Sequence, residues 1–192
     1  SHRPERAKPY PKRVLVFSPH PDDDVISMGG TFQRLVDQHH EVHVAYQTSG
    51  NIAVGDDELV RSVSLFKNIL DKFDPENNKL YPIIENALNF TISQKSAGDS
   101  DTPDILFVKG QIRREEARSA CRFVGLKPEN VHFLDLPFYE TGKVQKGKLT
   151  ELDVKIIIDL LEKVKPHQIF VAGDLADPHG THKVCLNAAL AA

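Results

Sequence analysis

Two short stretches of this sequence concentrate side chains that bind metal ions and transfer protons. Residues 18–24 read SPHPDDD, so one histidine and three carboxylates follow the apolar run 14–17. Residues 177–182 read DPHGTH and carry two histidines three positions apart. Adjacent carboxylates repel one another, and a divalent cation is the simplest group that would relieve this repulsion. Histidine and aspartate are ordinary zinc ligands, and a catalytic zinc takes about three protein ligands and keeps one open position.

Each stretch also has a plain structural interpretation. Aspartate at a helix start commonly caps the helix and interacts favourably with its dipole. A histidine pair spaced as H-x-x-H is weak evidence when it stands alone, and His39, His40 and His43 have no other ligand beside them, so we expect those three in turns and at the surface. The two stretches indicate a site because each follows a predicted strand, and open α/β sheets bind ligands at the carboxyl ends of their strands.

The elements that must position these residues alternate along the chain. Apolar runs predict strands, and apolar residues three and four positions apart predict helices. The expected strands are 14–17, 41–47, 131–134 and 168–172. The expected helices are 27–38, 57–73, 80–90, 111–124, 151–164 and 181–192. This alternation predicts an α/β fold with a doubly wound, mostly parallel sheet.

The segment between the second and third predicted strands is longer than such connections usually are. We expect a helical insertion at about 52–108, with a polar loop rich in helix breakers at 94–103. Residues 1–12 are basic, contain prolines and lack periodicity, so they are expected to form a linker or arm. The folded domain is then expected to cover 13–192.

The composition is that of an ordinary globular domain. The chain has 192 residues, of which 40% are hydrophobic and 27% charged, enough for one sizeable core. A net charge of -3 gives no reason to expect a nucleic-acid partner, and no apolar run approaches the ~18 residues of a membrane span. An apolar signal segment is absent, and Cys121 and Cys185 fall in predicted helices. We therefore expect buried, reduced thiols and a cytoplasmic location.

Three stretches resemble motifs of one enzyme superfamily. Residues 19–24 (PHPDDD) resemble the AHPDDE motif of the PIG-L/LmbE-like zinc-dependent N-acetylglucosaminyl deacetylases. Residues 179–182 (HGTH) resemble their HxDH motif, and residues 112–117 (IRREEA) are similar to their RxxEA helix start. The resemblance covers the chain from about residue 13 onward, apart from the insertion, and implies a Rossmann-like fold.

The resemblance also has implications beyond this segment. The superfamily usually continues past the last predicted helix, so we expect the domain to be truncated at its C-terminus. The sequences of residues 18–30 and 46–51 are similar to those of a bacterial subgroup that is often fused to a glucosamine-6-phosphate deaminase domain. Such a domain is therefore an implied partner, and no membrane partner is implied.

The resemblance implies roles for the motif residues. His20, Asp23 and His182 correspond to the metal ligands, with zinc as the best-fitting ion and another divalent first-row metal as the alternative. Asp22 corresponds to the general base, and His179 to the group that stabilises the tetrahedral oxyanion.

Two further positions are expected on the substrate side. Arg113 matches an arginine of the superfamily that contacts substrate, although a surface charge on a helix is an equally good interpretation. Asn51 ends the segment that closes the second strand, at the mouth of the same site.

Two positions depart from the superfamily pattern. Asp24 replaces a glutamate and is expected to cap the helix or orient a ligand. Thr181 replaces an acid that orients its histidine neighbour, and a hydroxyl cannot stabilise imidazolium as a carboxylate does. Asp174 or Asp177 would have to take over that role.

The leading hypothesis is a metal-dependent hydrolase that removes the acyl group from an N-acetylglucosamine-type sugar, or its phosphate, by means of metal-activated water. The alternative is a non-catalytic metal- or sugar-sensing module attached to a deaminase. A phosphotransfer receiver domain also places acids after its first strand, but it has no use for the histidine pair. A dinucleotide site is excluded because no GxGxxG follows the first strand.

Overall fold

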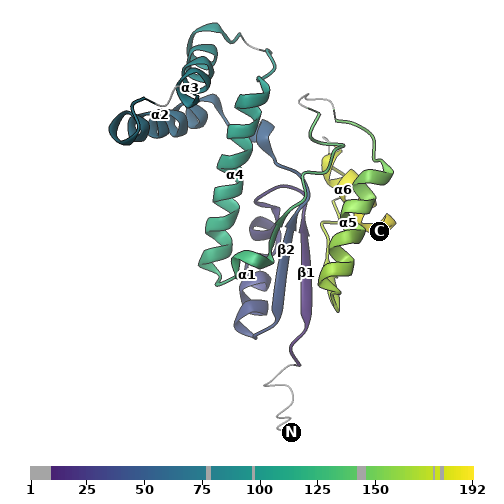
Figure 1. Cartoon of the computed structure of the whole chain (residues 1–192). Coiled ribbons are helices and arrows are strands. Elements are labelled where there is room, and N and C mark those ends of the chain that lie inside the picture. Colours follow the sequence, from purple (N-terminus) through teal and green to yellow (C-terminus); the bar gives the residue numbers. More distant parts are fainter. Residues whose placement is uncertain (1–9, 77–78, 97, 142–145, 175, 178–179) are drawn as a thin grey trace. The chain divides into compact units, whose positions relative to one another are not determined.

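The computed structural model describes residues 10–76, 79–96, 98–141, 146–174, 176–177 and 180–192 (Figure 1). Most of the predicted arm and His179 therefore lie outside the described residues. The described chain divides into a sheet unit, within 10–49, 114–141 and 146–192, and a helical unit within 50–113. None of the helices described has the length and apolar character needed to cross a membrane.

The sheet unit is built on four parallel strands, which are β1 (Arg13–Ser18), β2 (Glu41–Tyr46), β3 (Val131–Phe133) and β4 (Gln168–Phe170). Their order is β3-β2-β1-β4. In register, Val16 of β1 lies between Val44 of β2 and Phe170 of β4. The order reverses between β1 and β4, so the carboxyl ends of these two strands form the switch point where such sheets bind ligands. The expected α/β fold with a parallel sheet is confirmed.

Helices cover both faces of this sheet, which is why its strands are apolar on both sides. Figure 1 shows α5 (Glu151–Val164) and α6 (Thr181–Ala191) on the side of the sheet away from α1 (Asp23–Asp37). The core under α5 and α6 includes Leu15, Phe17, Ala45, Leu136, Ile157, Leu160 and Cys185. The core on the other face, under α1 and the last turns of α4 (Pro103–Phe123), includes Val14, Val16, Phe32, Val44, Tyr46, Ala117 and Cys121. Both cysteines are buried and free, as expected.

The first helix begins earlier than its predicted start at residue 27. The helix α1 starts at Asp23, and its backbone leaves helical geometry at Met28, where φ is -145°. The apolar pattern therefore detected the part of α1 that follows this kink. The early start places Asp23 and Asp24 in the first helical turn, directly after β1.

The helical unit contains the predicted insertion. It comprises η2 (Asn51–Ala53), α2 (Asp56–Phe73), α3 (Leu80–Asn89), the π-helical turn η3 (Phe90–Gln94) and the first part of α4. A short 3-10 turn, η4 (Pro128–Asn130), belongs to the sheet unit and leads into β3. The helix α4 begins at Pro103 rather than at 111, because proline is favourable at the first helical position and Ile105 is fully buried in the core of this unit.

Ion pairs hold both ends of the polar loop 94–103. Lys109 of α4 is only 3% exposed and lies 2.8 Å from a carboxylate oxygen of Asp56 and 2.7 Å from one of Asp101. Lys95 bridges the same two aspartates at 2.9 and 2.7 Å. Hydrogen bonds from Lys109 and Lys95 lower the pKa of Asp56. The two lysines neutralise the two aspartates. Their contacts join the start of α2 to the loop and to α4.

A histidine pair corrects one expectation about β2. His43 is only 8% exposed, and its Nδ1 lies 3.1 Å from Nε2 of His132 on β3, with the two rings stacked. The surface prediction for His43 is wrong because β2 is an inner strand whose two faces are both covered. His39 is exposed in a turn with φ of 60°, as expected.

Acid is expected to destabilise the fold through His132. Burial, followed by the charges of His43 and Lys163, lowers the pKa of His132 to about 4 from 6.5. Below pH 6.5 the unfolded chain binds a proton that the folded chain resists, so stability falls between pH 6.5 and about 4 and then levels off. The loss is at most about 3 kcal/mol for a shift of this size, and partial solvent exposure reduces it.

The measurement is the urea midpoint of the parent chain and of His132→Gln between pH 7 and pH 4. His132→Gln should show a shallower pH dependence than the parent, whereas His39→Asn, at an exposed turn position, should keep the parental slope. Equal slopes for the parent and His132→Gln would contradict this assignment.

Candidate metal centre

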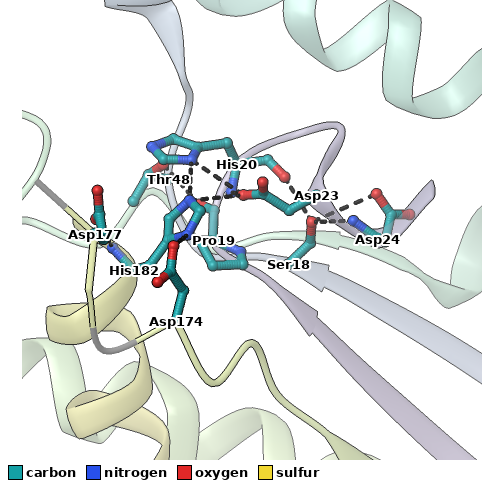
Figure 2. Close-up of polar contacts among 9 residues, drawn as sticks. All are labelled: Ser18, Pro19, His20, Asp23, Asp24, Thr48, Asp174, Asp177 and His182. Carbon is teal, nitrogen blue, oxygen red and sulfur yellow. Dashed lines mark hydrogen bonds and ion pairs between the residues drawn. The ribbon is translucent and has the colours of Figure 1, made fainter. Parts of the chain in front are cut away.

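Three side chains from two distant parts of the sequence converge at the carboxyl end of β1. Nδ1 of His20 lies 3.1 Å from Oδ2 of Asp23, and Nε2 of His182 lies 3.2 Å from the first atom and 3.3 Å from the second (Figure 2). All three side chains are partly buried. No second group of three converging metal donors occurs among the residues that the structure describes.

The donor atoms fit a divalent metal ion. They form a nearly equilateral triangle with edges of 3.1, 3.2 and 3.3 Å. A point equidistant from the three atoms can lie about 2 Å from each, the distance that zinc keeps to nitrogen and oxygen ligands. Two imidazoles and one carboxylate also suit other first-row ions, so the donor set indicates a divalent metal without choosing among them.

The turn after β1 explains why His20 and Asp23 face each other. Asp22 occupies the N-cap of α1, its amide donates to the carbonyl of His20 at 2.9 Å, and its own carbonyl accepts the amides of the first helical turn. The chain therefore passes from strand to helix within four residues. The amide of His20 also donates to Oδ2 of Asp23 at 2.8 Å, which fixes the carboxylate beside the imidazole.

Asp23 carries its negative charge in a partly buried position. Burial acts to raise the pKa of Asp23, but hydrogen bonds from His20 and the charges of His20 and His182 outweigh it and leave this pKa lowered. An ionised carboxylate is the form that coordinates a cation. The local hydrogen bonds therefore keep Asp23 in the state that the proposed ligand role requires.

Asp24 lies outside the triad and anchors the turn from beneath. It is 3% exposed, and the hydroxyl of Tyr46 donates to its Oδ2 at 2.9 Å. The Asp24 amide donates to Oγ of Ser18 at 3.0 Å, and that hydroxyl donates to the carbonyl of His20 at 2.6 Å. Burial raises the pKa of Asp24, and the hydrogen bond from Tyr46 partly offsets this. Asp24 thus acts on the backbone that carries His20.

Two aspartates surround His182 where the superfamily acid is missing. Oδ2 of Asp174 lies 3.6 Å from Nδ1 of His182, on the side of the ring away from the triad. Oδ2 of Asp177 accepts the His182 amide at 2.8 Å (Figure 2). Thr181 is buried as the first residue of α6. A separation of 3.6 Å exceeds a direct hydrogen bond, so Asp174 acts on the imidazole electrostatically or through one water.

A cavity of about 410 Å³ adjoins the triad at the switch point between β1 and β4. Asp23, Asp174 and His182 contribute its polar wall. Apolar side chains, including Met28 and Phe170, line other parts of it. A cavity with few polar groups and a cluster of titratable residues is the usual form of a small-molecule site.

Two predicted substrate-side residues belong to the helical unit. Asn51 is buried in η2, and Arg113 lies in α4, so both belong to the helical unit and their substrate roles stay predictions. His179 lies outside the described residues. One residue without any motif does contact the triad: the Tyr139 ring meets the His20 ring edge-on at 5.8 Å. Its neighbour Glu140 accepts hydrogen bonds from Ser49.

The fold and the triad define a parallel α/β protein with a candidate metal centre at its switch point. Residues 15–192 match the family model for PIG-L, described as GlcNAc-PI de-N-acetylase, and the chain belongs to this family. The family resemblance inferred from the motifs is thereby confirmed.

Two relatives add detail. A putative glucosamine-6-phosphate deaminase-like protein of Bacteroides thetaiotaomicron is 58% identical over all 192 residues, which make up 29% of that protein. The N,N'-diacetylchitobiose deacetylase of Pyrococcus horikoshii, solved with an inhibitor, aligns with a TM-score of 0.55 at 22% identity over 94% of this chain and 48% of its own. The chain thus spans less than a third of the first relative, and the second shares its fold.

Proposed function

We propose that this chain is a metal-dependent hydrolase that removes the acyl group from the amide of an N-acetylglucosamine-type sugar. The observation that carries the proposal is the convergence of His20, Asp23 and His182 beside a cavity at the switch point. Membership of the de-N-acetylase family supports the reaction class. The fold shared with a chitobiose deacetylase agrees with it.

We propose zinc as the ion held by His20, Asp23 and His182, where it would polarise the amide carbonyl and lower the pKa of water. Asp22 takes the proton from the attacking water and returns it to the leaving amine. Asp174 holds the His182 ring in place from its far side. His179 is proposed to stabilise the oxyanion, and Arg113 and Asn51 to contact the sugar.

The wider setting is also a proposal. The name of the Bacteroides relative indicates an amino-sugar phosphate, and that protein is more than three times as long as the matched segment. We propose that the natural partner of this domain is a glucosamine-6-phosphate deaminase-like part of the same polypeptide. The alternative function, a sensing module, retains the metal and the sugar site without turnover.

The test is a deacetylation assay of the zinc-loaded chain on N-acetylglucosamine and N-acetylglucosamine 6-phosphate, with detection of the free amine. Turnover should disappear after complete chelation and return when zinc is added back. Sugar binding by the metal-loaded chain without any turnover would favour the sensing module. Full turnover by a metal-free chain would contradict the proposed function.

A further inference from the structure

A half-buried lysine close to the candidate metal centre has an ammonium group without a hydrogen-bond acceptor among the described residues. The Nζ atom of Lys146 is shielded from solvent and has no hydrogen-bond partner in the described part of the chain. It lies 3.4 Å from the centroid of the Tyr139 ring, over the ring face. Burial lowers the pKa of Lys146, and the charge of Glu140 opposes that shift.

The ring contact alone does not satisfy this ammonium group. Cation–π attraction compensates part of the lost hydration, but it leaves the three N–H donors of the group without acceptors. Buried polar groups in folded proteins nearly always have a partner, and each exception calls for a missing water, ion or ligand. Lys146 therefore indicates an acceptor that the described protein residues do not supply.

The position of Lys146 connects it to the metal centre. Nζ of Lys146 lies over the face of the Tyr139 ring. The same ring packs edge-on against the His20 ring. Only one aromatic ring thus separates Lys146 from a candidate ligand. Glu140 binds the amide and hydroxyl of Ser49 at 3.0 and 3.1 Å, which ties the segment after β3 to the end of β2. Lys146 lies on the segment that follows the carboxyl end of β3, and ligands bind at the carboxyl ends of the strands in such sheets.

Other cations held in polar clusters differ from Lys146. Lys95, Lys109, Arg114 and Arg118, for example, are each paired with carboxylate groups. Carboxylates of the protein itself neutralise the charges of these side chains. Among the described residues, the charge of Lys146 is balanced by the Tyr139 ring face and the charge of Glu140 alone, so Lys146 is the better candidate for an anionic ligand.

We propose that Lys146 binds a phosphate monoester carried by the amino-sugar substrate. This inference rests on the proposed deacetylase function and assigns a specificity residue to the same site. Lysine ammonium is a mobile point charge that binds phosphate well, and its flexible stem allows it to leave the Tyr139 ring for the ligand. Phosphate is preferred to a sugar carboxylate because the Bacteroides relative is named for an amino-sugar phosphate.

The first test compares kcat/KM on N-acetylglucosamine 6-phosphate and on N-acetylglucosamine for the zinc-loaded parent, Lys146→Met and Lys146→Arg. The parent should favour the phosphorylated sugar, and Lys146→Met should reduce this preference by about 10-fold or more, the effect of losing a charge-assisted hydrogen bond. Lys146→Arg should retain much of it. The matched control is Lys148→Met, which removes an exposed lysine two positions away and should keep the parental preference.

Methionine packs well against aromatic rings, so a lysine that merely covers Tyr139 predicts an unchanged preference in Lys146→Met. That result would overturn the proposal. A second readout does not depend on turnover: calorimetric binding of glucosamine 6-phosphate and glucosamine to the same zinc-loaded variants. Tighter binding of the phosphorylated sugar by the parent, lost in Lys146→Met, supports the phosphate site even where neither acetylated sugar is cleaved. Equal binding of the two sugars by the parent overturns it, whereas absent cleavage alone contradicts only the deacetylase function.

Discussion

His182→Ala is expected to bind zinc at least about 100-fold more weakly than the parent chain. The substitution removes Nε2, one of the three donor atoms of the triangle with His20 and Asp23. Loss of a residue that merely supports a ligand typically costs ~10–100-fold in metal affinity, and loss of the ligand itself should cost more. The measurements are zinc content after dialysis against a competing chelator and calorimetric titration with zinc.

Graded variants make this test specific. Asp174→Asn leaves all three donors in place but removes the negative charge that faces Nδ1 of His182. Its loss of zinc affinity should therefore fall within ~10–100-fold. His39→Asn alters an exposed histidine in a turn and should bind zinc like the parent. Full zinc occupancy in His182→Ala would show that the triad is not the metal site.

The sheet and the meeting of the two histidine-bearing stretches followed from local patterns in the sequence, whereas the choice of Asp23 among the three aspartates came from the family resemblance. Short apolar runs predicted all four strands, and the helix at 151–164 begins and ends where the apolar spacing placed it. Once a parallel sheet is predicted, residues that follow different strands must meet at one edge. That rule alone brings His20 and His182 together, although 162 positions separate them.

The features that the sequence did not predict depend on contacts between distant segments. Lys109 resembles a surface residue in the sequence, and it is buried only because Asp56, 53 positions away, and Asp101 neutralise it. His43 is covered because His132 stacks on it across 89 positions. No local pattern encodes such pairs, since each partner has an ordinary alternative at the surface.

The contacts that orient His182 were predicted in part from the sequence. Asp174 and Asp177 were recognisable as possible substitutes for the missing acid because they lie in the same loop. Which atom each would contact depends on the turn before α6. The structure assigns the ring to Asp174 and the backbone amide to Asp177.

Asp22→Asn should keep the metal and the fold and lose turnover by ~10²–10⁴-fold, the usual contribution of a general base. The Asp22 side chain makes no capping hydrogen bond, and backbone hydrogen bonds of Asp22 hold the start of α1, so the turn that carries His20 should persist. The amide cannot take a proton near neutral pH. KM should therefore change little while kcat falls, which is the pattern of a lost transition-state interaction, and the acidic limb of the pH–rate profile should change with it.

Asp23→Asn is the informative comparison, because the neighbouring position is proposed to hold the ion rather than to move a proton. It should lose zinc affinity and activity together, whereas Asp22→Asn should separate the two. Asp37→Asn, at the exposed end of the same helix, controls for removal of one negative charge and should match the parent in both measurements. Zinc content and kcat on N-acetylglucosamine substrates, measured on the same preparations, decide the assignment. Loss of zinc in Asp22→Asn with retention in Asp23→Asn would mean that the two aspartates exchange roles, because the carboxylate that binds the ion cannot at the same time serve as the free base.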